Sequence, residues 1–380
     1  MRIGIITILK VNNYGAELQA YATQAALKRL GYNAEIIDYL FYKNPKHRPT
    51  QRSKPVLPFS FVNKTKEWLY PRIEKIRSLL GKKSQQQRTQ RFEMFHRDNT
   101  SISSTYHSID ELYVAKMDYD VYLTGSDQVW NPGIYSSLDP YFLTFAPKGC
   151  KRIAYAASFG VSHLPYYAKE YYRRHLAGYT AIGVREKDAV DIVKEMTGRK
   201  AEWVLDPTLL LTRDEWLRVA KPYPIQGDYI LIYELTPCPY VRQLADHFHS
   251  AKGWQIVRIC KSANPEGKDR GIINITDAGP AEFLSLIANA SLVITNSFHG
   301  TAFSVNFNCD FYTILPMRKR NNSRQRSLLE LFILTERLLV EGAPMPDTSL
   351  VAIDYKAANQ RLSEERGKSI SFLKRAIDGE

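Results

Sequence analysis

The stretch Ser291-Leu-Val-Ile-Thr-Asn-Ser-Phe-His-Gly300, followed by Thr301-Ala-Phe-Ser-Val305, predicts the fold more clearly than any other part of the chain. Its apolar residues 292–294 predict a buried strand, its polar residues predict a turn that holds His299, and the small residues after the turn predict a helix. In open α/β sheets ligands bind at the carboxyl ends of the strands, where the amino end of the next helix attracts anions. His299 is therefore a candidate anion-binding residue. A histidine in a tight turn without any ligand is the alternative.

The same order of strand, polar turn and helix recurs along the chain. Residues 3–8 predict a strand, residues 18–30 a helix that stops at Gly31, and residues 34–39 a second strand. This βαβ spacing predicts a parallel sheet. Five predicted strands end in polar turns, at residues 12–17, 125–131, 158–162, 185 and 296–300. Together they predict a cleft lined by the carboxyl ends of strands from two domains.

A chain of 380 residues is too long for one ordinary core, so we expect two domains of roughly 150–200 residues. The expected fold class is α/β, with two Rossmann-like doubly wound domains that face each other across a cleft. The expected boundaries are residues 1–206 for the N-terminal domain, 207–345 for the C-terminal domain with the His299 turn, and 346–380 for a helical tail. A basic insertion at about 43–97 interrupts the first domain.

The composition excludes several classes of protein. The four cysteines have no paired spacing and the eight histidines show no metal-ligand pattern, so we expect neither a disulfide framework nor a metal or other cofactor. No apolar run approaches the ~18–20 residues of a membrane-spanning helix, and the apolar start is too short for a secretion signal. The expected location is the cytoplasm, including the inner face of the cytoplasmic membrane.

The net charge of +13 is concentrated in one segment. Residues 43–97 contain fifteen Lys and Arg against three Glu, and prolines make the first part of the segment irregular. From Lys64 the apolar and basic residues have helical spacing, with Pro71 predicted to break the helix. A solvated excursion packed on the domain and an element that binds anionic lipid or another polyanion are both open interpretations. Nucleic acid comes third, because no recognition motif is present.

Taken in order, the polar turns resemble those of the polysaccharide pyruvyl transferase family, over about residues 1–345. The resemblance depends on five motifs, whose combination is far more specific than any one of them. They are Asn13-Tyr14-Gly15, Gly125-Ser-Asp-Gln-Val-Trp130, Val184-Arg185-Glu-Lys-Asp188, Val204-Leu-Asp-Pro207 and Thr295-Asn-Ser-Phe-His-Gly-Thr301.

The resemblance implies a glycosyltransferase-B-like enzyme that transfers an enolpyruvyl unit from phosphoenolpyruvate to a sugar. The product would be a cyclic pyruvate ketal, with release of phosphate. It implies as acceptor a bacterial capsule or exopolysaccharide glycan, or its polyprenyl-diphosphate-linked precursor. An enzyme that works on such a precursor must visit an anionic bilayer, which the basic segment would suit.

The donor carries a carboxylate beside a phosphate, so its site needs cations. Arg185 matches the arginine of the family motif and is expected to bind phosphoenolpyruvate; an ion pair with Glu186 or Asp188 is the alternative. His299 matches the family histidine and suits proton donation or stabilisation of the departing phosphate, since its pKa lies near working pH. The sequence leaves both roles of His299 open.

This chain departs from the family pattern beside the histidine. Many relatives have an arginine two residues earlier, where this chain has Ser297 within the expected donor site. Arg324 and Arg326, from the basic loop 318–326, are the expected replacements. Arg324 falls at the start of a predicted helix, where a cation is disfavoured unless it serves an anion. Surface charge without a ligand is the alternative for this loop.

The acceptor sugar is expected to contact the first domain. Asn13, Glu17 and Asp127 are candidates to bind it, and a carboxylate such as Asp127 would serve as general base. Relatives often carry the acid directly after the motif glycine, where this chain has Ala16. Asp127 as a helix cap is the alternative. Trp130 could stack on a sugar ring or pack in the core.

Two other functions stay open. A nucleotide-sugar glycosyltransferase of the same architecture would need an acidic residue for the ribose or pyrophosphate, and the second domain shows no clear pattern of that kind. A non-catalytic protein that binds a glycan or an anion is conceivable because of Ser297. A nucleic-acid binder would depend on charge alone and is not expected.

Overall fold

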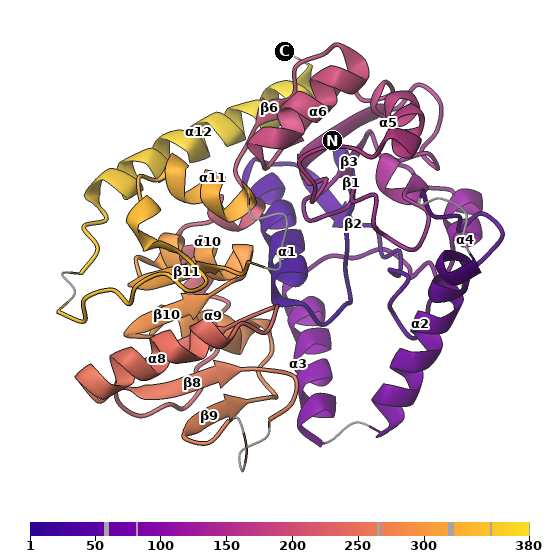
Figure 1. Cartoon of the computed structure of the whole chain (residues 1–380). Coiled ribbons are helices and arrows are strands. Elements are labelled where there is room, and N and C mark those ends of the chain that lie inside the picture. The colour runs from indigo at the N-terminus through magenta and orange to yellow at the C-terminus, as the bar shows by residue number, and fades with distance from the viewer. Residues whose placement is uncertain are drawn as a thin grey trace. The chain divides into compact units, whose positions relative to one another are not determined.

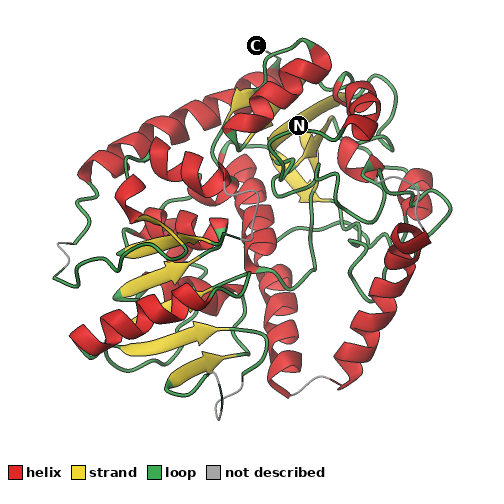
Figure 2. Ribbon diagram, viewed as in Figure 1, coloured by secondary structure: helices red, strands yellow, loops and turns green. Residues whose placement is uncertain are grey.

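The computed structural model describes residues 1–56, 61–80, 83–263, 267, 269–317, 323–349 and 352–379, with only the backbone for residues 61–64, 67 and 77–80. Clustering of the chain divides it into two compact units. The first unit contains Met1–Gly81, Glu93–Leu210 and Glu365–Glu380, and the second contains Lys82–Phe92 and Leu211–Glu364. Each unit is built around one parallel sheet of six strands (Figures 1 and 2).

The sheet of the first unit has the strand order β2-β1-β3-β4-β5-β6, so the direction of winding changes between β1 and β3. Its central strands are mostly apolar and buried, as expected for a parallel sheet covered on both faces, while the edge strands β2 and β6 also carry exposed polar residues. The strands are β1 (Arg2–Ile6), β2 (Asn33–Ile36), β3 (Val121–Thr124), β4 (Lys151–Ala157), β5 (Ala181–Val184) and β6 (Glu202–Trp203). The helices between them along the chain are α1 (Tyr14–Arg29), α2 (Phe61–Leu80), α3 (Lys83–Asn99), α4 (Ile109–Val114), α5 (Lys169–Leu176) and α6 (Lys187–Thr197), of which α3 has its residues up to Phe92 in the second unit.

The sheet of the second unit has the order β12-β11-β10-β7-β8-β9, which is the strand order of a Rossmann fold with its switch point between β7 and β10. Its strands are β7 (Tyr229–Tyr233), β8 (Gln255–Ile259), β9 (Ile272–Ile275), β10 (Leu292–Thr295), β11 (Phe311–Leu315) and β12 (Leu338–Val340). The helices are α7 (Arg213–Leu217), α8 (Pro239–Lys252), α9 (Pro280–Ala288), α10 (Phe298–Phe307), α11 (Ser323–Leu331) and α12 (Lys356–Asp378), the last of which continues into the first unit.

The basic segment has an irregular first part, as predicted, followed by the two helices α2 and α3. The prediction that Pro71 breaks the helix is wrong, because α2 continues through it. Proline removes one backbone hydrogen bond, but Tyr70 packs against the core of the first unit and Pro71 is buried, which compensates for the loss. Among the residues that the structure describes, no helix combines the length and the apolar character needed to cross a membrane.

Candidate functional site

The His299 turn is fixed by hydrogen bonds that its own polar residues make. Thr295, the last residue of β10, donates from its hydroxyl to the backbone oxygen of Tyr233 at 2.5 Å and accepts from the backbone N–H of Ser297 at 3.0 Å. Ser297 caps α10, since its Oγ accepts from the backbone N–H of Gly300. The serine at the family's arginine position therefore serves to start the helix, and His299 is the second helical residue.

The turn lies where the winding of the second sheet reverses. The Asn296 side chain accepts from the backbone N–H of Leu235 at 2.8 Å and donates to the backbone oxygen of Thr236 at 2.6 Å, which ties the turn to the loop after β7. Because β7 and β10 are neighbours with their connections on opposite sides, this is the place where a Rossmann-type sheet opens to a ligand.

Gly300 lets α10 begin close against β10. A Cβ at this position would lie 2.3 Å from the Thr295 Oγ1, well inside the closest contact that real side chains make. Any other residue would force the start of the helix away from the strand, and His299 would move with it.

Arg324 lies beside the same turn. It is the second residue of α11, which the Gln325 side chain ties to the backbone oxygen of Asn296 at 3.2 Å. The Phe298 ring lies 5.8 Å from the Arg324 guanidinium carbon and 5.3 Å from the His299 ring. The second unit thus places an imidazole and a guanidinium around one aromatic ring at the carboxyl edge of its sheet.

Of the other cations expected in this loop, the structure describes only Arg326. Arg326 lies on α11 and is exposed. Residues 318–322, which include the two arginines and the lysine at the start of the basic loop, lie outside the described residues.

In the first unit, Arg185 follows β5 and has a fully buried side chain. Its guanidinium donates to the Asp206 carboxylate at 2.7 Å and to the Asp127 carboxylate at 3.3 Å, and lies 3.8 Å from the Glu186 carboxylate. Burial would lower the pKa of Arg185, but the three carboxylates outweigh it and raise the pKa above its ordinary value. The charge is therefore neutralised by the protein, which fits the ion-pair interpretation of Arg185; donor binding by it stays a prediction.

Two of these carboxylates also accept hydrogen bonds from the loops around them. Asp206 caps the short helix at 207–209 through the N–H of Thr208, and also accepts from the Ser126 hydroxyl at 3.1 Å. Glu186 accepts from the hydroxyl of Ser158 at 2.8 Å and from the backbone N–H of Phe159 at 2.9 Å. Both residues therefore fix loops at the carboxyl ends of strands.

Asp127 differs from the other two carboxylates because its side chain is 17% exposed. Its backbone is in the left-handed region, with φ of 69°, a conformation that is strained for a residue with a side chain. The strain is held by the hydrogen bond from the Ser158 N–H to the Asp127 backbone oxygen and by the pairing with Arg185. Asp127 is thus the acid of the cluster that solvent reaches, held in a fixed orientation.

The N-terminal turn is also rigidly held. Asn13 caps α1, because its side chain accepts from the backbone N–H of Ala16. Glu17 is 1% exposed and pairs with His96 of α3. Burial alone would lower the pKa of His96, but the attraction and hydrogen bond of Glu17 raise it above its ordinary value. Binding of a sugar by Asn13 or Glu17 stays a prediction, while both residues stabilise the turn.

Trp130 is a core residue in this structure. Its ring is fully buried and stacks on Phe142 with ring centroids 5.3 Å apart, and its indole N–H donates to the backbone oxygen of Tyr141. This is the packing alternative that the sequence left open.

Sequence reasoning missed the roles of Asp206 and His96. Asp206 belongs to the Val204–Pro207 motif, whose Asp-Pro pair is a common signal for a capped helix start, but its ion pair is with Arg185, which follows the neighbouring strand β5. His96 had no local signal. Among the described residues, no group of three or more His, Cys, Asp and Glu side chains is arranged to hold a metal ion.

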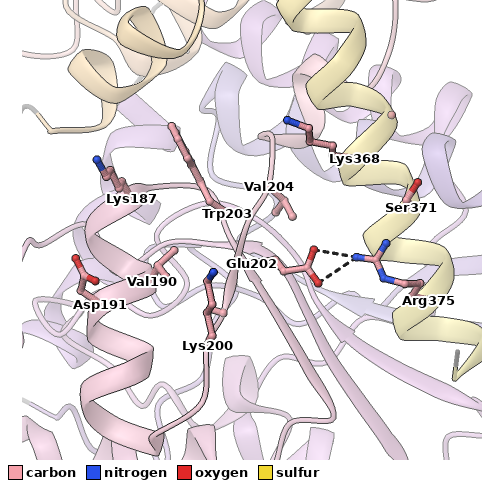
Figure 3. Close-up of a pocket in the computed structure, with 12 residues that line it drawn as sticks. Lys187, Val190, Asp191, Lys200, Glu202, Trp203, Val204, Lys368, Ser371 and Arg375 are labelled. Carbon is pink, nitrogen blue, oxygen red and sulfur yellow. Dashed lines mark hydrogen bonds and ion pairs between the residues drawn. The ribbon is translucent and has the colours of Figure 1, made fainter.

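A pocket of about 830 Å³ lies at the edge of the first sheet, beside β6. Figure 3 shows Arg375 of α12 on one side, in an ion pair with Glu202, and Lys187 and Asp191 of α6 on the other. None of the candidate site residues lines this pocket.

The fold and the two carboxyl edges define an α/β protein with two Rossmann-like units. The model of the family "Polysaccharide pyruvyl transferase" matches residues 13–316. The chain belongs to the polysaccharide pyruvyl transferase family. No curated protein matches the sequence.

Solved structures share the architecture at low sequence identity. The UDP-GlcNAc 2-epimerase from Methanocaldococcus jannaschii, in complex with UDP-GlcNAc and UDP, has a TM-score of 0.50 and 12% identity, with 100% of each chain covered. The UDP-GlcNAc 2-epimerase from Neisseria meningitidis has a TM-score of 0.46 and 9% identity, with 100% of this chain and 93% of that chain covered. The E. coli heptosyltransferase with ADP has a TM-score of 0.42 and 12% identity, with 96% and 100% covered. The expected α/β, glycosyltransferase-B-like class is confirmed by the fold shared with the first of these.

Proposed function

We propose that this protein transfers the enolpyruvyl unit of phosphoenolpyruvate to two neighbouring hydroxyls of a sugar, forming a cyclic pyruvate ketal and releasing phosphate. The acceptor would be a bacterial surface polysaccharide or its polyprenyl-diphosphate-linked precursor. Membership of the family supports the pyruvyl transfer. The observation that carries the proposal is that His299 and Arg324 both lie beside the Phe298 ring, at the switch point of the second sheet.

The donor fits the second unit because its charges are opposite to those found there. Phosphoenolpyruvate presents a carboxylate and a phosphate, which gain from the Arg324 guanidinium and from the amino end of the ten-residue α10. Arg326, exposed on the same helix as Arg324, is the second candidate cation. The carboxyl edge of the first sheet is less suitable for this anionic donor, because three carboxylates already surround Arg185.

The reaction begins with a proton added to the methylene carbon of the donor, which leaves an oxocarbenium-like centre at the adjacent carbon. One sugar hydroxyl forms a C–O bond there and loses its proton. A second hydroxyl then replaces the phosphate at the same carbon, so that the C–O bond to the phosphate breaks. His299 is suited to deliver the first proton or to stabilise the departing phosphate.

The acceptor fits the first unit. Asp127 is the exposed carboxylate of its cluster and would accept the proton of an attacking hydroxyl. Arg185 then acts as a positioning residue that holds Asp127, with Asp206 as its anchor. The chemistry requires the donor and the acceptor to be bound at the same time.

The test is incubation with phosphoenolpyruvate and a panel of lipid-linked or aryl galactosides, glucosides and N-acetylmannosaminides. We expect phosphate release and a product heavier than the acceptor by one pyruvate less one water. Release of a nucleoside diphosphate from a sugar nucleotide would instead identify a glycosyltransferase. Binding of phosphoenolpyruvate or a glycan without turnover on any acceptor would identify a non-catalytic protein.

A further inference from the structure

The exposed face of α2 is a feature of the first unit that the proposed reaction does not use. Trp68, Leu69 and Ile76 have exposed fractions of 53%, 44% and 57%. At 100° per residue these three side chains, together with Arg72 and Lys75, fall within an arc of about 120° on the helix. Arg72 and Lys75 are also exposed. A single helix face therefore presents both large apolar groups and cations to solvent.

The opposite side of α2 is fixed to the first unit. Tyr70 packs against the core and lies 5.5 Å from the Tyr42 ring, and the Lys66 ammonium lies 3.0 Å from the Tyr135 hydroxyl. In Figure 1, α2 extends away from the strands of its sheet. The exposed face is thus held outward by the packing of the other face, and its exposure follows from the register of the helix.

Three basic residues of α3, the other helix of the basic segment, are bound to other parts of the protein. Arg88 donates to the backbone oxygen of Cys260 at 3.2 Å, and Arg91 pairs with Asp277 at 3.0 Å. His96 pairs with Glu17. These residues of α3 therefore stabilise the fold, whereas Arg72 and Lys75 of α2 face solvent.

The residue types on the exposed face of α2 indicate what kind of partner it would bind. A face of Trp, Leu and Ile flanked by Arg and Lys suits the boundary between acyl chains and anionic headgroups, because the rings and alkyl groups enter the bilayer and the cations stay at its surface. Among the described side chains of α2 the only carboxylate is that of Glu74, which lies outside this arc. A second copy of the same face would bring like charges together, so self-association is disfavoured.

We propose that Trp68, Leu69, Arg72, Lys75 and Ile76 form a docking face for a bilayer rich in anionic lipid. The proposal concerns a surface separate from the candidate catalytic residues and does not depend on the reaction. An acceptor that is anchored in such a bilayer would be brought to the enzyme by this contact.

The experiment measures co-sedimentation of the full chain with two kinds of vesicle. One contains phosphatidylcholine alone, and the other contains phosphatidylcholine with about 30% phosphatidylglycerol, which gives the bilayer a negative surface. We expect binding to the anionic vesicles only. Arg72→Glu together with Lys75→Glu should weaken it by about tenfold or more. The matched control is Lys194→Glu with Lys374→Glu, which makes the same change of net charge at exposed positions on α6 and α12 and should weaken binding far less.

A second readout identifies the inserted residue. Trp68 fluorescence should shift to the blue and be quenched by brominated lipid, and both signals should disappear in Trp68→Phe while binding persists. Equal loss of binding in the two charge variants would show diffuse attraction and overturn the proposal. Binding that survives Arg72→Glu with Lys75→Glu, or a stable dimer that Trp68→Gln with Ile76→Gln dissociates, would also overturn it.

Discussion

The carboxyl edges of the two sheets have the same architecture but opposite chemistry. In the first unit, three carboxylates surround the buried Arg185, and the group that solvent reaches is the acid Asp127. In the second unit, the edge holds His299 and Arg324, both largely buried, beside the amino end of α10. The second edge lies at the switch point of its sheet, whereas the cluster at the first edge gathers residues that follow β3, β5 and β6. Under the proposed function, these side chains would favour different ligands: hydroxyl groups at the first edge and an anion at the second.

The largest expected effect comes from removing the imidazole of the second edge. His299→Asn should lower the rate of phosphate release from phosphoenolpyruvate by about 10²–10⁴-fold, because a positioned proton donor or charge stabiliser contributes that much. His249→Asn is the matched control, since His249 is exposed at the end of α8. If the two variants have equal activity, the second edge is not the site of the chemistry.

A substitution at the first edge should lower the stability of the fold, whereas the His299 substitution at the second edge should lower the reaction rate. Asp206→Asn leaves the buried Arg185 without its main partner and should lower the free energy of unfolding by about 3 kcal/mol or more, measured by urea denaturation. Asp127→Asn removes a longer contact from a partly exposed side chain, so its loss of stability should be below about 1 kcal/mol. The Asp127 variant should instead lose transfer to the sugar. Equal losses of stability in the two variants would contradict the assignment of a structural role to Asp206 and a catalytic role to Asp127.

Arg324 tests whether the second edge holds the donor. Arg324→Met should raise the KM for phosphoenolpyruvate by about tenfold through loss of a charge-assisted contact, with a smaller change in kcat. Arg324→Lys should recover part of the affinity, because lysine restores the positive charge but lacks the planar set of N–H donors of a guanidinium group. Arg326→Met shows whether the exposed neighbour contributes. An unchanged KM in both methionine variants would place the phosphate elsewhere.

The smallest expected effect concerns the pair of His96 and Glu17. The folded-state pKa of His96 is raised above its ordinary value of 6.5, so the protonated histidine stabilises the fold. This contribution is fully present below about pH 6.5 and is lost as the pH rises through the raised pKa. His96→Gln should flatten the dependence of Tm on pH in that range. A Tm profile identical to that of the unsubstituted chain would show that the pair contributes no pH-dependent stability.

Local patterns in the sequence predicted much of the second edge. Apolar runs followed by polar turns identified β10 and the start of α10, and the position of Arg324 at the start of a helix was predicted from the same kind of signal. These features depend on residues close together in the chain. The prediction that Pro71 breaks a helix failed because burial of Tyr70 and Pro71 outweighs one lost hydrogen bond.

By itself, the sequence determined that this is a parallel α/β protein of the pyruvyl transferase family, with His299 in a strand-to-helix turn. Only the tertiary structure decided that Arg185 is paired with Asp206 and Asp127, that Trp130 is in the core, and that α2 and α3 use their cations differently. The physical reason is that ion pairs and burial depend on residues brought together from distant parts of the chain. Periodicity and turn chemistry, in contrast, act between near neighbours.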